Sequence, residues 1–184
     1  MDKKYLIHAI GNIAWGYVFF YVSVNLGTID ILPDWVFFIL VITALKPLSE
    51  VVPSAKLLEP LGVLLGVLYG FQWLFKVVGH PIEWYLFTVI LSVLVLYFNF
   101  QLLTNLAETA KLHSYPEEKK ILHLRTAQAI LTTVAAIPLP WNEVSYLYFG
   151  LAIVHLIVVV WICTVLLGLR KKMALAYQVP AEES

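Results

Sequence analysis

Cysteine, charge and recognisable catalytic motifs are all scarce in this sequence. A single cysteine, Cys163, excludes an internal disulfide and a cysteine-based metal cluster. Only 13% of the 184 residues are charged, and the formal net charge of zero gives a nucleic-acid partner no electrostatic support. The chain contains no H-E-x-x-H, no G-x-S-x-G and no glycine-rich phosphate loop. We therefore predict no metal, no cofactor and no nucleic-acid partner, and the case for an enzyme is weak.

Long apolar runs are what the sequence has instead. Hydrophobic residues make up 61% of the chain, and runs of about 20 apolar residues match a bilayer core about 30 Å thick. We predict an all-α integral membrane bundle, because long continuous runs do not fit the short alternating strands of a membrane barrel. The six predicted transmembrane helices cover about residues 6–26, 31–48, 58–79, 82–106, 121–139 and 144–169. They form one domain over residues 1–169, followed by a cytoplasmic tail over residues 170–184.

Basic residues decide the orientation of these spans. With six spans, only Lys76 lies on the side opposite the N-terminus. The other eleven lie on the N-terminal side: Lys3, Lys4, Lys46, Lys56, Lys111, Lys119, Lys120, Arg125, Arg170, Lys171 and Lys172. Because Lys and Arg favour the cytoplasmic side, both termini are predicted to be cytoplasmic. A re-entrant second segment, suggested by its short length, would place the last basic cluster outside, against the same rule.

Two local patterns predict details of the helices. Gly62, Gly66 and Gly70 follow one another at four-residue spacing, so they share a helix face that another helix can approach closely. This face is either packed inside the bundle or forms a dimer contact. Ser114 and Glu117 have the spacing of a capping box, which predicts the start of the fifth helix.

Polar residues near the cytoplasmic side form a candidate polar cavity. Eight of them come from spans one, four and five: His8, Asn12, Gln101, Asn105, Glu108, Arg125, Gln128 and Thr132. His155 is added to this candidate cavity although it lies deeper, near the midpoint of span six. Polar groups in hydrocarbon are costly, so they are expected to face the bundle interior or water. The alternative is that Arg125 extends to the membrane surface, the amides join helices, and His155 is a neutral side chain bonded to a neighbour.

A second group of acidic residues marks the predicted outer side. This outer acidic rim consists of Asp30, Asp34, Glu83 and Glu143. Asp30 and Asp34 flank Pro33 at the start of the second span, where carboxylates complement the positive end of a helix. The alternative is a site for a cation or a cationic substrate at the outer mouth.

The segment from Asn25 to Trp35 carries the pattern N-x-G-T-x-D-x-L-P-D. It resembles a turn between the first two spans of small polytopic membrane proteins of Gram-positive bacteria. The resemblance covers about eleven residues and implies a multi-pass protein of the bacterial cytoplasmic membrane. It implies no particular activity and no site residues. The paired early His and Cys of six-span peptide-processing membrane proteases have no counterpart here.

Three functions stay open on the sequence alone. The first is a non-enzymatic membrane module for assembly, accessory or sensing roles, which packs against a membrane-protein partner or a second copy within the lipid bilayer. The second is a transporter of a small solute or ion that uses the polar cavity. The third is an intramembrane enzyme, for which His8, His155, Asp30, Asp34 and Glu108 would be the candidate groups.

Overall fold

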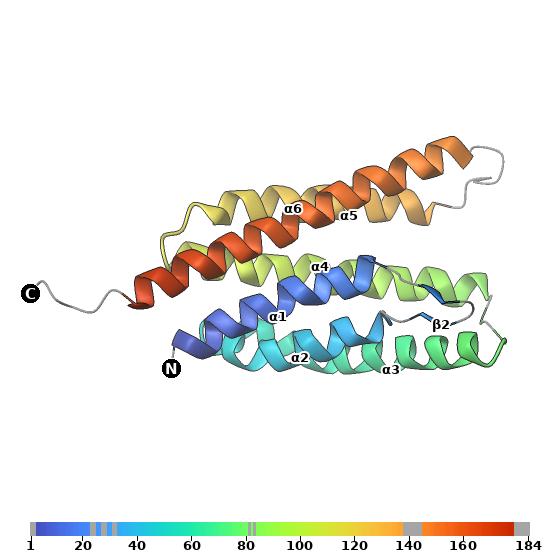
Figure 1. Cartoon of the computed structure of the whole chain (residues 1–184), viewed down its shortest axis with the longest axis horizontal. Coiled ribbons are helices and arrows are strands. Elements are labelled where there is room, and N and C mark those ends of the chain that lie inside the picture. Colours follow the sequence, from blue (N-terminus) through green and yellow to red (C-terminus); the bar gives the residue numbers. More distant parts are fainter. Residues whose placement is uncertain are drawn as a thin grey trace, which may run out of the picture.

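A computed structural model describes residues 3–22, 25–26, 29–30, 33–80, 82, 84–137 and 145–178. Six α-helices make up most of the structure, so the predicted all-α bundle is confirmed (Figure 1). The α-helices are α1 (Lys3–Tyr21), α2 (Trp35–Ser49), α3 (Leu58–Val77), α4 (Tyr85–Leu112), α5 (Glu117–Ala136) and α6 (Ser145–Gln178). A short 3₁₀-helix, η1 (Pro53–Leu57), precedes α3. Two-residue strands β1 (Asn25–Leu26) and β2 (Ile29–Asp30) pair antiparallel between α1 and α2.

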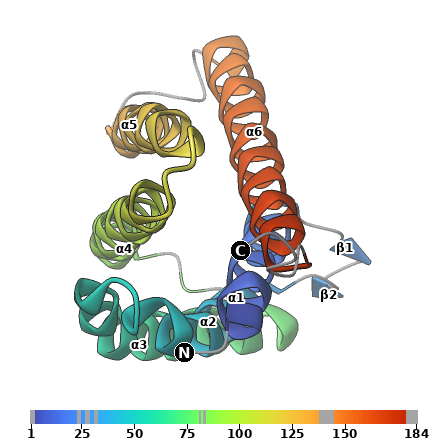
Figure 2. The same cartoon turned by 90° about the vertical axis from the view of Figure 1, so that its left-hand side faces the viewer.

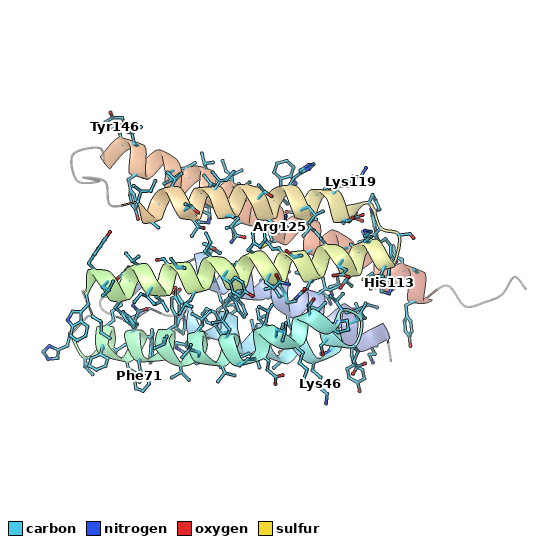
Figure 3. The ribbon with its side chains drawn as sticks, turned by 180° about the vertical axis from the view of Figure 1, so that it is seen from behind. Lys46, Phe71, His113, Lys119, Arg125 and Tyr146 are labelled. Atoms are coloured by element: carbon cyan, nitrogen blue, oxygen red, sulfur yellow. The ribbon has the colours of Figure 1, made fainter. Side chains whose placement is uncertain are left out.

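The six helices pack in the order of the chain, and α6 returns to pack against α1 (Figure 2). The start of α1, the end of α2, the α4–α5 turn and the end of α6 lie at one end of the bundle (Figure 1). We call this the basic end, because Lys46 and Lys119 lie there (Figure 3). Lys76 is in the last turn of α3, which ends at the opposite end of the bundle.

Within the described residues, three helical stretches are long and apolar enough to cross a membrane. They are Pro53–Val77, Tyr85–Leu112 and Tyr146–Tyr177, and Trp35–Ser49 is a shorter apolar helix. The remaining two helices, α1 and α5, are more polar than the sequence predicted for membrane spans. The first three turns of α5 contain charged residues such as Glu117, Lys120 and Arg125, and α1 begins with Lys3 and Lys4.

The last helix is longer than the predicted sixth span. The span was predicted to end at residue 169, but α6 continues to Gln178, so much of the predicted tail is helical. This extension packs against the bundle, because Met173 is buried and the Lys172 ammonium donates to a Glu117 carboxylate oxygen at the start of α5. Other bounds also shift: α1 ends at Tyr21 rather than near residue 26, and α4 extends to Leu112.

The predicted capping box at the start of α5 is wrong. Pro116 takes the N-cap position, and no side chain caps this helix end. Ser114 instead ends α4 in the left-handed conformation, with φ of 59°. Its N–H donates to the Lys111 carbonyl, and the Tyr115 N–H donates to the Ala110 carbonyl, which is the bond pattern of a Schellman motif.

Glycine and aromatic residues set how closely the first four helices pack. A Cβ added to Gly16 would lie 2.9 Å from Phe37 Cδ2, so glycine lets α1 and α2 approach at this point. Of the predicted glycine face, Gly62 is buried against Phe98, and Gly66 lies against Phe38 but is partly exposed. A Cβ at Gly70 would meet nothing within 4 Å.

Candidate functional site

A polar contact joins α1, α5 and α6 inside the bundle. The Gln128 Nε2 amide on α5 donates to the Tyr21 hydroxyl on α1 at 2.7 Å. The Tyr21 ring in turn packs against the His155 ring on α6, with ring centroids 5.1 Å apart. Tyr17, one turn earlier on α1, is completely buried and stacks on Tyr21. Four polar side chains from three helices therefore meet; Tyr17 and Gln128 are buried, and Tyr21 and His155 are partly exposed.

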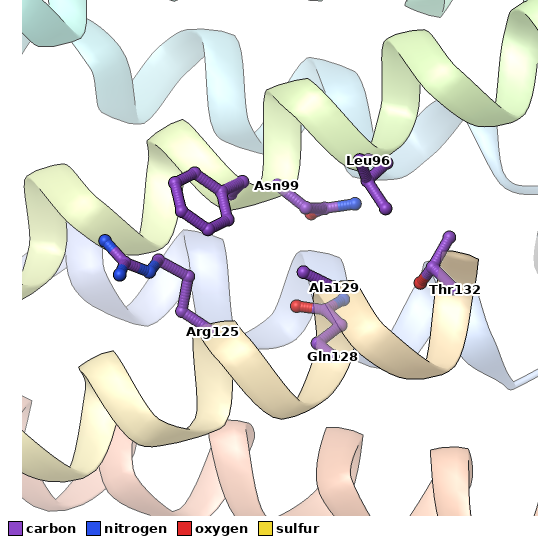
Figure 4. Close-up of a pocket in the computed structure, with 7 residues that line it drawn as sticks. Leu96, Asn99, Arg125, Gln128, Ala129 and Thr132 are labelled. Atoms are coloured by element: carbon purple, nitrogen blue, oxygen red, sulfur yellow. The ribbon is translucent and has the colours of Figure 1, made fainter. Parts of the chain in front are cut away.

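The same glutamine lines a small pocket between α4 and α5 (Figure 4). Asn99 projects from α4 toward Gln128, and Thr132 lies one turn further along α5. The pocket volume is about 10 Å³, which is close to the minimum that holds one water molecule. Gln128 therefore links this pocket to the contact between Tyr21 and His155.

Arg125 places a positive charge at the edge of this pocket. Its Nη1 donates to Thr104 Oγ1 at 2.9 Å, and its Cζ lies 4.1 Å from the centroid of the Phe100 ring. Both partners are on α4, so the guanidinium is held across the hairpin by a hydrogen bond and a cation–π contact. In the described part of the chain, no carboxylate lies within ion-pair distance of it. The charge is thus partly solvated by polar and aromatic groups but has no counter-ion there.

Residues Tyr17, Tyr21, Asn99, Arg125, Gln128, Thr132 and His155 are called the interior polar cluster from here on. Hydrogen bonding in this cluster is incomplete among the described residues. Five of its side-chain atoms are buried without a hydrogen-bond partner: Tyr17 Oη, Asn99 Oδ1, Arg125 Nε, Gln128 Oε1 and His155 Nε2. Burying a polar group without a partner costs roughly 1–3 kcal/mol. Water or a polar ligand that forms hydrogen bonds with these five atoms would remove this cost.

The structure brings together only part of the predicted polar cavity. Arg125, Gln128, Thr132 and His155 belong to the interior polar cluster. Gln101 and Asn105 face elsewhere: the Ser54 hydroxyl donates to Asn105 Oδ1 at 2.8 Å, and Gln101 Nε2 donates to the same oxygen at 3.3 Å. These two amides join α4 to η1 and do not line the pocket.

The remaining three predicted cavity residues lie on the surface or between α1 and α2. His8 and Glu108 are exposed. Asn12 is partly buried, and its Nδ2 donates to Thr43 Oγ1 on α2 at 3.4 Å. His8 and Asn12 therefore do not reach the interior polar cluster.

The outer acidic rim falls largely outside what the structure describes. Glu83 and Glu143 lie outside the described residues, and of Asp30 only the backbone pairing with Asn25 is described. Asp34 holds the N-cap position of α2, as its place in the sequence suggests, but its side chain makes no capping hydrogen bond.

Three members of the interior polar cluster were not singled out from the sequence. Tyr17 and Tyr21 lie in an aromatic-rich segment, where a tyrosine looks like one more apolar ring. Their spacing of four residues was an available signal, because it places both hydroxyls on one helix face. Asn99 lies near the middle of α4, and a polar residue at mid-helix in a membrane segment is a signal by itself.

Known proteins give no family for this chain. No family model, no curated protein and no solved structure matches it. What the interior polar cluster does must therefore follow from its own chemistry.

Proposed function

We propose that this chain is a bacterial cytoplasmic-membrane protein that carries a small anionic solute across the bilayer. In this proposal all six helices cross the membrane, and both termini are cytoplasmic. The position of Lys46 and Lys119 at one end of the bundle, with Lys76 in the last turn of α3 at the other, supports this orientation. The interior polar cluster is the solute site.

The observation that carries the proposal is the position of Arg125. A guanidinium has five N–H donors, and here one of them bonds to Thr104 while Nε is buried without a partner. A cation inside a membrane bundle is costly unless an anion or water compensates it. A small oxyanion, such as a carboxylate, fits this need because a guanidinium binds two of its oxygens at once.

The other members of the cluster supply the remaining contacts. Gln128 donates its amide to the Tyr21 oxygen, which leaves the Tyr21 hydroxyl proton free to donate to a solute. Tyr17 Oη and His155 Nε2 are further unpartnered groups near it. The small pocket volume of about 10 Å³ fits a closed state between transport steps. Solute entry would then require the helices around the cluster to separate.

Flux across vesicles tests the proposal. Purified protein reconstituted in liposomes is expected to take up at least one of chloride, nitrate, formate, acetate and bicarbonate. Arg125→Gln is expected to lower that flux at least about tenfold, because a neutral amide loses the charge-assisted bonds. Lys119→Gln is the matched control, since Lys119 is an exposed basic residue of the same helix outside the cluster. Absence of flux for every anion by folded protein, or equal flux in Arg125→Gln, would reject the proposal.

A specific observation also favours the non-enzymatic membrane module. Along the first turns of α6, from Tyr146 to Ile157, only Leu151 and His155 are partly covered, and the other side chains are exposed. A helix that leaves nearly all faces open offers a large apolar surface to a membrane-protein partner or a second copy. If cross-linking from Phe149 in native membranes captures such a partner while no anion is transported, the module is the better description.

A further inference from the structure

The basic end of the bundle holds a pocket separate from the interior polar cluster. It has a volume of about 310 Å³ and is lined by Tyr5 of α1 and by Thr43, Lys46, Pro47 and Glu50 at the end of α2. Lys46 extends away from the bundle at this end (Figure 3). The pocket therefore opens on the outer surface of the bundle.

The pocket offers one positive and one negative charge on the same helix face. Lys46 and Glu50 are four residues apart and both are exposed. Side chains at this spacing have Cβ atoms about 5–6 Å apart. In the described ranges, neither charge lies within 4 Å of an opposite charge. Both charges are therefore available to a ligand that itself carries a cation and an anion a few ångströms apart.

An apolar groove lies further along the same helix, toward its N-terminal end. It has a volume of about 280 Å³ and lies between α2 and α3. Its lining residues are Trp35, Phe38, Ile39, Ile42, Val63, Gly66 and Val67. Ile39, Thr43 and Lys46 follow one another on one face of α2, so one extended lipid molecule along this face can contact both the pocket and the groove. Gly66 contributes to the hollow because it has no side chain to fill it.

We propose that this surface binds one phospholipid with a phosphoethanolamine headgroup. The Lys46 ammonium holds the phosphate, and the Glu50 carboxylate accepts hydrogen bonds from the primary ammonium of the lipid. Tyr5 lines the same pocket, and tyrosine rings favour the membrane interface. One acyl chain lies against Ile39, Ile42 and Val67.

Charge complementarity selects this headgroup over the other common ones. An anionic glycerol headgroup would bring its phosphate to Lys46 but would give Glu50 no cation. A choline headgroup carries a cation without N–H groups, so it cannot donate to Glu50. The proposal depends on the bundle lying in a bilayer, and it does not depend on solute transport.

Lipid-dependent stability of the delipidated full chain in detergent is the test. Phosphatidylethanolamine, phosphatidylglycerol and phosphatidylcholine with identical acyl chains are titrated, and the rise in unfolding temperature is measured. Phosphatidylethanolamine is expected to reach half of its effect at a concentration about tenfold below that of the other two, as expected for one additional charged hydrogen bond. Equal potency of the three lipids would overturn the proposal.

Substitutions of Glu50 test its role in the lipid preference. Glu50→Gln is expected to abolish the preference for phosphatidylethanolamine, and Glu50→Lys to reverse it in favour of phosphatidylglycerol. Lys56→Gln and Glu59→Gln are the matched controls, since both residues are exposed near the same end but do not line the pocket. An unchanged lipid preference in Glu50→Lys would overturn the proposal.

Two further measurements distinguish lipid binding from binding of a free phosphodiester and from the transport proposal. Soluble glycerophosphoethanolamine is expected to stabilise only at much higher concentration, because it lacks the acyl chain in the groove. Equal potency would assign the pocket to a free phosphodiester and overturn the lipid proposal. Arg125→Gln is expected to keep the lipid preference, so a failure of the transport proposal leaves this result unaffected.

Discussion

Single residues set the spacing between the first two helices. Gly16 is the clearest case, because a methyl group there would lie 2.9 Å from the Phe37 ring and 3.5 Å from its carbonyl oxygen. Phe37 is completely buried and packs on Tyr17, Phe20 and Phe98. The ring therefore has little room to move.

Gly16→Ala is expected to lower the free energy of unfolding by about 1–3 kcal/mol through overpacking. The measurement is the unfolding midpoint in detergent. Gly70→Ala is the matched control, because nothing lies within 4 Å of a Cβ at that position and alanine favours helix by up to about 1 kcal/mol over glycine. Similar destabilisation by both substitutions would contradict the proposed close contact.

Residue spacing also explains how far the site could be predicted. Arg125, Gln128 and Thr132 follow one another at intervals of three and four, which placed them on one helix face, and all three line the same pocket. On α4, the sequence predicted Gln101 as a residue of the polar cavity, but Asn99 is the one that lines the pocket. The two positions differ by about 200° around a helix. Which of them meets α5 depends on how α4 packs on its neighbours, and one helix's periodicity does not contain that information.

At the scale of elements, the extension of α6 is fixed to α5 by one ion pair. Glu117 is buried, and its second oxygen, Oε2, has no hydrogen-bond partner. Lys172 provides the opposite charge from a half-exposed position. Removing Lys172 would leave a buried carboxylate without its cation, which is the costly case for a buried pair.

Lys172→Met is expected to destabilise the protein by about 1–2 kcal/mol, at the lower side of the range for a charged hydrogen bond because the lysine is half exposed. Adding Glu117→Gln should recover most of the loss, since the uncompensated charge is then removed. Lys171→Met is the control, because Lys171 is exposed and takes no part in this pair. Thermal unfolding and amide exchange over residues 170–178 are the measurements. A Lys172→Met variant as stable as the Lys171→Met variant would show that the pair does not hold the extension.

The bounds of helices could be predicted where the residue composition changes abruptly along the sequence. The start of α3 at Leu58 and the end of the α4–α5 turn at Glu117 lie close to the predicted limits. The end of α6 was missed because Arg170, Lys171 and Lys172 were interpreted as the beginning of a tail. Basic residues near a C-terminal helix end are compatible with helix, so charge alone did not mark where the helix stops.

For the whole molecule, the decisive question is whether the basic end faces the cytoplasm. Cys163 is the only cysteine, so a Cys163→Ala background allows single cysteines to be placed at Lys119 and at Trp84. Lys119→Cys is expected to react with a membrane-impermeant maleimide only after cells are opened. Trp84→Cys, near the other end of the bundle and 77% exposed, is expected to react in intact cells. Reaction of both cysteines from the same side would contradict the six-span orientation.

Unequal helix lengths would make the six-span arrangement proposed above deform a bilayer unevenly around the molecule. α2 has 15 residues, a rise of about 22 Å, while α4 has 28 residues, a rise of about 42 Å. A hydrocarbon layer about 30 Å thick exceeds the first length and falls short of the second. In the proposed six-span arrangement, lipid next to α2 would thin and α4 would tilt or extend into the headgroups, each at a cost of a fraction of a kcal/mol per ångström. In that arrangement the bilayer is expected to be thinner beside α2 than beside α4, and lipids with shorter acyl chains are expected to gather along α2.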